Sequence, residues 1–120
     1  MIFTLTQSYY SYSLHGKKQV LIISSSAPSH SPGNMALKIS SGDDNLICIG
    51  DIFHHPEEIE HTNLYTAPLM TKDGRATREK ILSQDVNLHA LVFACHFPFP
   101  GLGHIIRKEA IYTWEPVYNV

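Results

Sequence analysis

The chain has 120 residues, of which 43% are hydrophobic and 17% charged, and its formal net charge is -2. This length and composition predict one folded domain, 1–120, and argue against a disordered chain. The basic residues are scattered along the sequence, so no positive patch of the kind that binds DNA or RNA is formed, and we expect no nucleic-acid partner.

No segment predicts insertion into a membrane or export. The longest apolar runs, at 20–23 and 90–95, are too short to cross a bilayer. The N-terminus lacks a basic region followed by a long apolar stretch, which is the mark of a signal peptide. We therefore expect a cytoplasmic protein in which Cys48 and Cys95 are reduced, buried packing residues.

The first part of the chain has the sequence pattern of strands. Five apolar or β-branched runs predict strands, at 2–6, 9–14, 19–24, 35–40 and 45–49. A Ser-, Pro- and Gly-rich loop over 25–34 separates the third run from the fourth, and the turn at 41–44 joins the last two as a hairpin. The stretch 53–71 is predicted to be irregular.

One helix and three further strands are expected after this stretch. The helix spans 75–84, with Asp73 as its N-cap and a narrow apolar stripe of Ala76, Ile81 and Leu82. Later apolar runs predict a buried strand and a terminal hairpin, at 88–95, 104–107 and 111–114.

Three potential metal ligands each follow a strand-like run: His30, Asp51 and His96. Imidazoles and carboxylates are the donors of hydrolytic zinc sites, and a residue at a strand end is held by the sheet behind it. Gly50 lets the backbone approach closely before Asp51. The chain contains no His-x-His-x-Asp-His cluster, so these residues predict only half of a metal site.

A series of short motifs accompanies the three ligands: Ser29-His30-Ser31-Pro32-Gly33-Asn34, Gly50-Asp51, His54-His55-Pro56, Ala76-Thr77-Arg78, the run from His96 to Gly103, and Tyr112-Thr113-Trp114-Glu115-Pro116. In order and spacing, this series resembles the C-terminal half of bacterial metallo-β-lactamase-fold hydrolases. The resemblance covers about 19–116. It implies an α/β (α+β) fold, one half of an αββα sandwich, with a mixed, mostly antiparallel sheet and a helix on one face.

The same resemblance implies that the second sheet of the sandwich lies in the absent N-terminal half. We therefore expect one apolar face of the sheet, formed around 19–24, 35–49 and 90–94, to be poorly covered. Such a face favours a partner, either the N-terminal half on a separate chain or a second copy in a homodimer. A gene remnant, a fragment and a split protein would all give a chain of this kind.

The resemblance also implies roles for individual residues. His30 would complete a first metal site, Asp51 would bridge two metals, and His96 would belong to the second. His54 and His55 would support these ligands or the scaffold. The cofactor would be two divalent ions, zinc above all, and a hydroxide held between them would be the nucleophile, so no side chain is assigned as the catalytic group.

Each ligand has a structural alternative: His30 as a solvated loop residue, Asp51 as a turn residue and His96 as a buried histidine. The remaining histidines, at positions 15, 61, 89 and 104, are expected to be surface or structural residues. Phe97 and Phe99 are expected to pack, or to border the mouth of a substrate site.

Two functions follow. The chain is half of a metal-dependent hydrolase of ester, lactone or thioester-like bonds, inactive alone because three donors hold two ions weakly or not at all. The alternative is a non-catalytic remnant or interaction module that retains the scaffold. A small cupin-like barrel is less favoured, because no two histidines are separated by a single residue.

Overall fold

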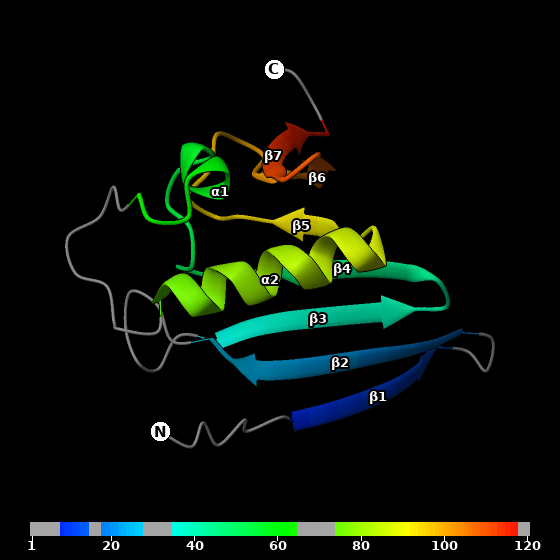
Figure 1. The fold of residues 1–120 in the computed structure, drawn as a ribbon. Helices are drawn as coiled ribbons and strands as arrows, with labels where there is room; N and C mark the ends of the chain where they lie inside the picture. Colours follow the sequence, from blue (N-terminus) through cyan, green and yellow to red (C-terminus); the bar gives the residue numbers. More distant parts are fainter. Residues whose placement is uncertain (1–7, 15–17, 28–34, 65–73, 118–120) are drawn as a thin grey trace.

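The structure of the chain is a computed structural model, which describes residues 8–14, 18–27, 35–64 and 74–117. Within these residues seven strands form one sheet, in the order β1-β2-β3-β4-β5-β6-β7 (Figure 1). The elements are β1 (Ser8–Leu14), β2 (Lys18–Ser26), β3 (Met35–Ser41), β4 (Asp44–Cys48), α1 (Glu57–Glu60), α2 (Gly74–Leu88), β5 (Leu91–Phe93), β6 (Leu102–Lys108) and β7 (Ile111–Pro116).

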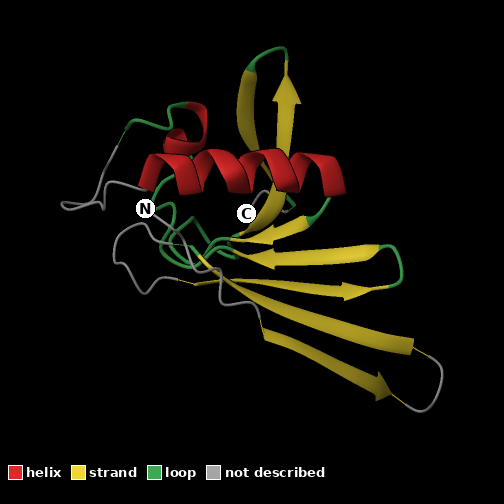
Figure 2. Cartoon of the chain, turned by 60° about the horizontal axis from the view of Figure 1, so that its bottom comes forward, coloured by secondary structure: helices red, strands yellow, loops and turns green. Residues whose placement is uncertain are grey.

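One pair of neighbouring strands differs from all the others. Strands β4 and β5 are parallel, whereas every other neighbouring pair is antiparallel. A parallel pair requires a crossover, and the chain between β4 and β5 carries both helices. The sheet is therefore mixed and mostly antiparallel, as the sequence predicts. In Figure 2 the hairpin of β6 and β7 stands at a steep angle to β1–β4, which reflects the twist of the sheet.

Four predicted strands before the helix and the terminal hairpin are confirmed. The predicted helix is confirmed too, but it is longer and runs to Leu88. The strand predicted at 88–95 is shorter in the structure and spans Leu91–Phe93. Its first predicted residue, Leu88, belongs to α2, and the chain turns after Phe93. The predictions at 2–6, at His15 and at Asp73 lie outside the described residues.

Helix α1 lies in the stretch predicted to be irregular. With four residues, it is too short to show a helical period in the sequence. Pro56 stands at its N-terminus with φ -55°, the backbone angle that proline already prefers and a helix requires. The proline was visible in the sequence, but the buried side chains that hold the turn were not.

One face of the sheet forms the core. Four buried residues share this face by register: Ala36, Ile47, Val92 and Ile105. Helix α2 lies over it and runs roughly along the strands (Figure 1), and Ile81 and Leu82 from α2 join the same buried cluster. Neither of the two described helices is long and apolar enough to cross a bilayer.

The buried stripe of α2 differs from the predicted one. Ala76 is exposed, whereas Arg78 is completely buried. Residues three and four apart share a helix face, so Arg78 lies on the face of Ile81 and Leu82, and Ala76 does not. The buried face of α2 therefore carries a charge, which needs compensation within the protein.

The opposite face of the sheet is apolar and open. By register it presents Val20, Ile22, Leu37, Ile39, Leu46, Cys48, Leu91 and Phe93, and none of these residues is buried. Leu37 is 39% exposed and Phe93 is 38% exposed, which is high for large side chains on interior strands. Neither described helix covers this face (Figure 1). The prediction of a poorly covered apolar face is confirmed.

The two cysteines are free, but they are not both buried as predicted. Cys48 is half-buried on the open face, and burial raises the pKa of its thiol. Cys95 is exposed, and its Sγ lies 3.7 Å from the carbonyl oxygen of Gly50. Strand β5 ends at Phe93. The alternation of side chains between the two faces of a strand therefore does not apply to Cys95, and its side chain is not directed into the core.

Candidate metal centre

The parallel strands β4 and β5 bring Asp51 and His96 together. The register pairs Cys48 with Phe93, and Asp51 and His96 each follow their strand's paired residue by three positions (48 to 51 and 93 to 96). The carboxyl ends of parallel neighbours meet at one edge of a sheet, which is where such folds place ligand sites. His96 Nε2 lies 2.6 Å from Asp51 Oδ1.

Two glycines shape the turns that carry these side chains. Gly50, directly before Asp51, has φ +56°, and Gly101 has φ +71°, both in the region that favours glycine. The amide of Ala94 donates to the carbonyl of Gly101 at 2.8 Å, closing the loop that holds His96. A Cβ at Gly101 would lie 2.5 Å from the carbonyl oxygen of Ala94, so this loop closes only around glycine.

His54 is the third potential ligand at this edge. One donor atom each from Asp51, His54 and His96 lie within 4.8 Å of one another. The imidazole rings of His54 and His96 are stacked, with centroids 4.6 Å apart and planes inclined by 24°. The sequence predicted a supporting role for His54 and gave no sign which residue of the His54-His55 pair faces the site.

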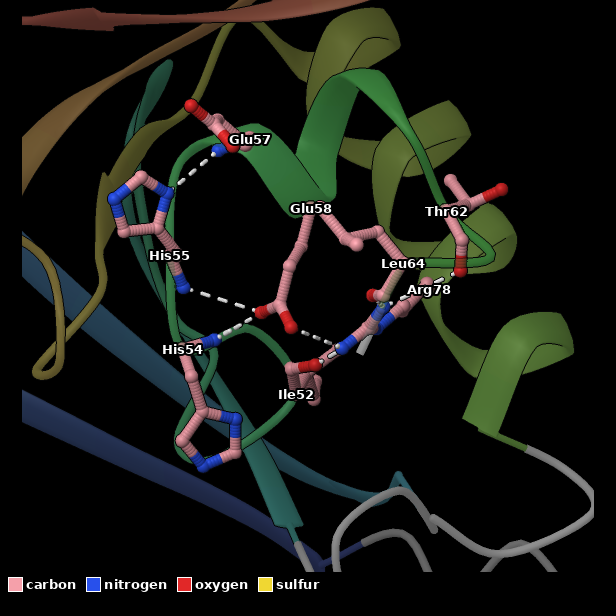
Figure 3. Close-up of polar contacts among 8 residues, drawn as sticks. All are labelled: Ile52, His54, His55, Glu57, Glu58, Thr62, Leu64 and Arg78. Carbon is pink, nitrogen blue, oxygen red and sulfur yellow. Dashed lines mark hydrogen bonds and ion pairs between the residues drawn. The ribbon is translucent and has the colours of Figure 1, made fainter. Parts of the chain in front are cut away.

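The backbone of His54 is fixed by a buried carboxylate (Figure 3). Glu58 Oε1 accepts hydrogen bonds from the amides of His54 and His55, at 2.5 and 3.1 Å. Its other oxygen, Oε2, lies 3.2 Å from Arg78 Nη2, and both side chains are fully buried. The Glu58 side chain from α1 thus joins the loop of His54 to helix α2.

Arg78 binds the same loop through its carbonyl groups. Its guanidinium donates to the backbone oxygens of Ile52, Thr62 and Leu64, at 3.0, 3.2 and 2.5 Å (Figure 3). It also lies 5.2 Å from the ring centroid of Phe53, a cation–π distance. A buried charge stays favourable only when it is paired and hydrogen-bonded, and Arg78 meets both conditions.

The sequence did not identify Glu58 and Arg78 as parts of the site. Arg78 was visible as a member of the Ala76-Thr77-Arg78 motif, and it is a charged residue three and four positions before Ile81 and Leu82 of α2. A charged residue that belongs to this motif and lies on the apolar face of a helix is the signal that could have identified Arg78. Glu58 carried none, because an acidic residue in the first turn of a helix is ordinarily a surface residue.

The other histidines among the described residues occupy the scaffold or the surface. The His55 ring points away from His54, and its Nδ1 accepts a hydrogen bond from the amide of Glu57 at 3.2 Å (Figure 3). His104 Nδ1 lies 3.1 Å from the carbonyl oxygen of Ala90, a structural contact. His61 and His89 are exposed. His30 lies outside the described residues, so its role in the site stays a prediction.

The two phenylalanines of the His96 loop have different surroundings. Phe97 is buried and packs edge-on against Trp114, with ring centroids 4.9 Å apart and planes at 89°. This confirms its predicted packing role. Phe99 is 86% exposed, so packing is the wrong prediction for this side chain, which projects from the loop that carries His96.

The donor set fits a metal of the zinc type. Two imidazoles and a carboxylate are the ligands of many zinc hydrolases, and each comes from a segment held by the sheet or by the Glu58–Arg78 pair. The side chains of His96 and Asp51 are 42% and 47% exposed, so an ion and a substrate can reach them from solvent.

No protein-family model matches the sequence, and no curated protein matches it either. Among solved structures, the chain is similar to AbOPH, a hydrolase in the β-lactamase superfamily, with a TM-score of 0.67 and 22% identity over 79% of this chain and 34% of that one. It is also similar to AidC, a dizinc quorum-quenching lactonase, with a TM-score of 0.64 and 26% identity over 91% of this chain and 36% of that one.

The chain spans about a third of the length of these two structures. The similarity extends over most of its own length. The resemblance drawn from the sequence motifs is thereby confirmed. The chain has the metallo-β-lactamase fold, over part of the length of that fold.

Proposed function

We propose that the chain is the C-terminal half of a metal-dependent hydrolase, whose complete form cleaves an ester, lactone or thioester-like bond. The observation that carries this proposal is the 2.6 Å approach of His96 to Asp51 at the ends of two parallel strands. AidC, which shares the fold, is a dizinc lactonase, and this favours a lactone or ester among the candidate substrates.

In this proposal Asp51 and His96 hold zinc together with His30 and with donors from the N-terminal half. The bound metal supplies Lewis-acid polarisation of the scissile carbonyl. The residues of this chain place the donors: Gly101 closes the loop of His96, and Glu58 fixes the backbone of His54 beside it. Because the side chain of Asp51 is half-exposed, a substrate carbonyl reaches this edge from solvent.

The proposed partner is the second sheet of the fold, which would carry the His-x-His-x-Asp-His cluster. It would pack on the open apolar face around Leu37 and Phe93, whether it belongs to the same polypeptide or to another. Sheets that pack face to face bury side chains from both inner surfaces, and this face is apolar along the middle of its central strands. Without that sheet, the chain is expected to be inactive.

The second candidate is a non-catalytic scaffold of the same fold. The observation in its favour is that the His96–Asp51 contact is a hydrogen bond in its own right, which stabilises the strand ends without any metal. Three donors are also too few for two ions. This candidate retains the open face as its interaction surface.

Coexpression distinguishes the two candidates. The chain is produced together with a second polypeptide that supplies the N-terminal half of the fold with its His-x-His-x-Asp-His cluster, and the purified complex is assayed on a lactone, an ester and a thioester. The hydrolase proposal predicts turnover by the complex, none by the chain alone, and loss of turnover in Asp51→Ala but not in the control Asp43→Ala, an exposed residue of the turn between β3 and β4. A stable complex that holds zinc yet cleaves none of the three would favour the scaffold.

A further inference from the structure

We propose that His54 is a metal ligand, and that Asp51, His54 and His96 together bind one divalent ion of the zinc type within this chain alone. The inference rests on the proposed function, in which Asp51 and His96 face a metal, and adds a donor from the same half. The sequence predicted weak or absent metal binding by this chain. That prediction took His30, Asp51 and His96 as the ligands and gave His54 a supporting role.

The positions of the three side chains carry the proposal. Their donor atoms already lie within 4.8 Å of one another, although they come from two loops, one between β4 and α1 and one between β5 and β6. Donors of a tetrahedral zinc site with bonds near 2.0–2.1 Å are about 3.3 Å apart. The 2.6 Å contact between His96 and Asp51 must therefore widen slightly, and the longer separations must close. Side-chain rotation alone provides changes of this size.

His54 is the most firmly placed of the three. Its amide donates to Glu58, which is fully buried and paired with Arg78, and its ring stacks on that of His96. Its side chain is half-buried, whereas that of its neighbour His55 is exposed and turned away (Figure 3). A donor held in this way loses little conformational entropy when it binds a metal.

The chemistry of the donor set identifies the ligand class. Two neutral imidazoles and one carboxylate favour zinc and similar borderline ions over magnesium or calcium, which prefer oxygen donors. Three protein donors on a tetrahedral ion leave one position open, which is the arrangement of catalytic rather than structural zinc sites. The site would therefore take a single ion and retain access for a further ligand from solvent.

The test is a cobalt(II) titration of the full chain, followed by the visible absorption of the bound ion and by zinc competition. We expect one ion per chain, and the Kd raised at least about 10–100-fold in His54→Ala and in His96→Ala. The control His61→Ala, an exposed histidine outside the site, is expected to bind as the wild type does.

A second measurement does not depend on any variant. In the wild-type chain, zinc is expected to shift the imidazole nitrogen resonances of His54 and His96 and to leave those of His61 and His89 in place. Circular dichroism establishes that each variant is folded. His54→Gln is measured alongside His54→Ala, because the side-chain amide of glutamine still forms hydrogen bonds but is a poor zinc ligand.

Each result supports or overturns the inference. No binding by the wild-type chain, or normal binding by both His54 variants, would overturn it. If Asp51→Ala and His96→Ala lose the ion while His54→Ala retains it, the inference fails and the proposed function stands. The proposed function fails separately, when the coexpressed complex has no hydrolase activity.

Discussion

His96 Nε2 and Asp51 Oδ1 lie 2.6 Å apart, although 45 residues separate them in the sequence. Their proximity follows from the parallel pairing of β4 with β5, because each side chain stands at the same distance beyond its strand. Neighbouring parallel strands end at the same sheet edge, so a helical crossover between them is sufficient to juxtapose two distant donors.

The buried pair of Glu58 and Arg78 should be essential for stability. Arg78→Met removes the guanidinium and leaves the Glu58 carboxylate buried without its charge partner, which costs about 3–5 kcal/mol. Urea unfolding of the purified chain measures the loss.

The matched control for this pair is Arg75→Met on the same helix. Arg75 pairs with Glu79 at 3.1 Å, but the two side chains are 62% and 55% exposed. A solvent-exposed pair of this kind contributes about 0.3–0.5 kcal/mol. Equal losses in the two variants would show that Arg78 is not a buried, structure-determining charge.

Gly101→Ala is expected to destabilise the loop of His96. The added Cβ would meet the carbonyl oxygen of Ala94 at 2.5 Å, on a backbone whose φ of +71° already disfavours alanine. Gly42→Ala is the control, because Gly42 also has a positive φ but a Cβ there would meet no atom of the described residues within 4 Å. Left-handed strain alone costs about 1–2 kcal/mol, so the loss in thermal stability should be larger at position 101 than at 42. Equal losses would exclude the steric contact.

The two cysteines should differ in reactivity towards a disulfide reagent. Cys95 is exposed, whereas Cys48 is half-buried and burial raises the pKa of its thiol, so that less thiolate forms at a given pH. Single-cysteine variants, Cys48→Ser and Cys95→Ser, separate the two rates. The rate at Cys48 should continue to rise with pH above the ordinary pKa of a thiol. Faster labelling of Cys48 near neutral pH would contradict this.

Adjacent residues on β3 distinguish the two faces of the sheet. Ala36 is 3% exposed on the covered face, and Leu37 is 39% exposed on the open face. Ala36→Lys should cost about 3–5 kcal/mol, because it buries an unpaired charge. Leu37→Lys should change the stability of the chain by less than about 0.5 kcal/mol and prevent the complementary half from binding. Calorimetric unfolding and a binding assay measure the two effects.

The strands and the open face of the sheet were predicted from the sequence more accurately than the buried polar contacts. Strands at 35–40 and 45–49 were recognisable because their apolar pattern and the turn between them are local. The open face was predictable as well, since the motifs matched only one half of a known sandwich. Ala76 was predicted wrongly because it lies on a different face of the helix from Ile81 and Leu82, and Cys95 because the strand before it ends at Phe93.

The candidate site was predictable in part. Asp51 and His96 were identified because each follows a strand, but the place of His54 depends on Glu58 and Arg78, which come together only through tertiary packing. No local pattern encodes an ion pair between residues of two helices that are separated by a loop. The same reason explains why Glu58, a buried acid in a four-residue helix, was not anticipated.

Anomalous X-ray scattering at the zinc edge, on crystals of the chain grown with zinc, would locate the bound ion without any substitution. We predict one strong peak within about 2.0–2.2 Å of a carboxylate oxygen of Asp51 and an imidazole nitrogen of His96. A zinc ion held by other residues, with this carboxylate and imidazole still hydrogen-bonded to each other, would contradict the assignment of the metal centre.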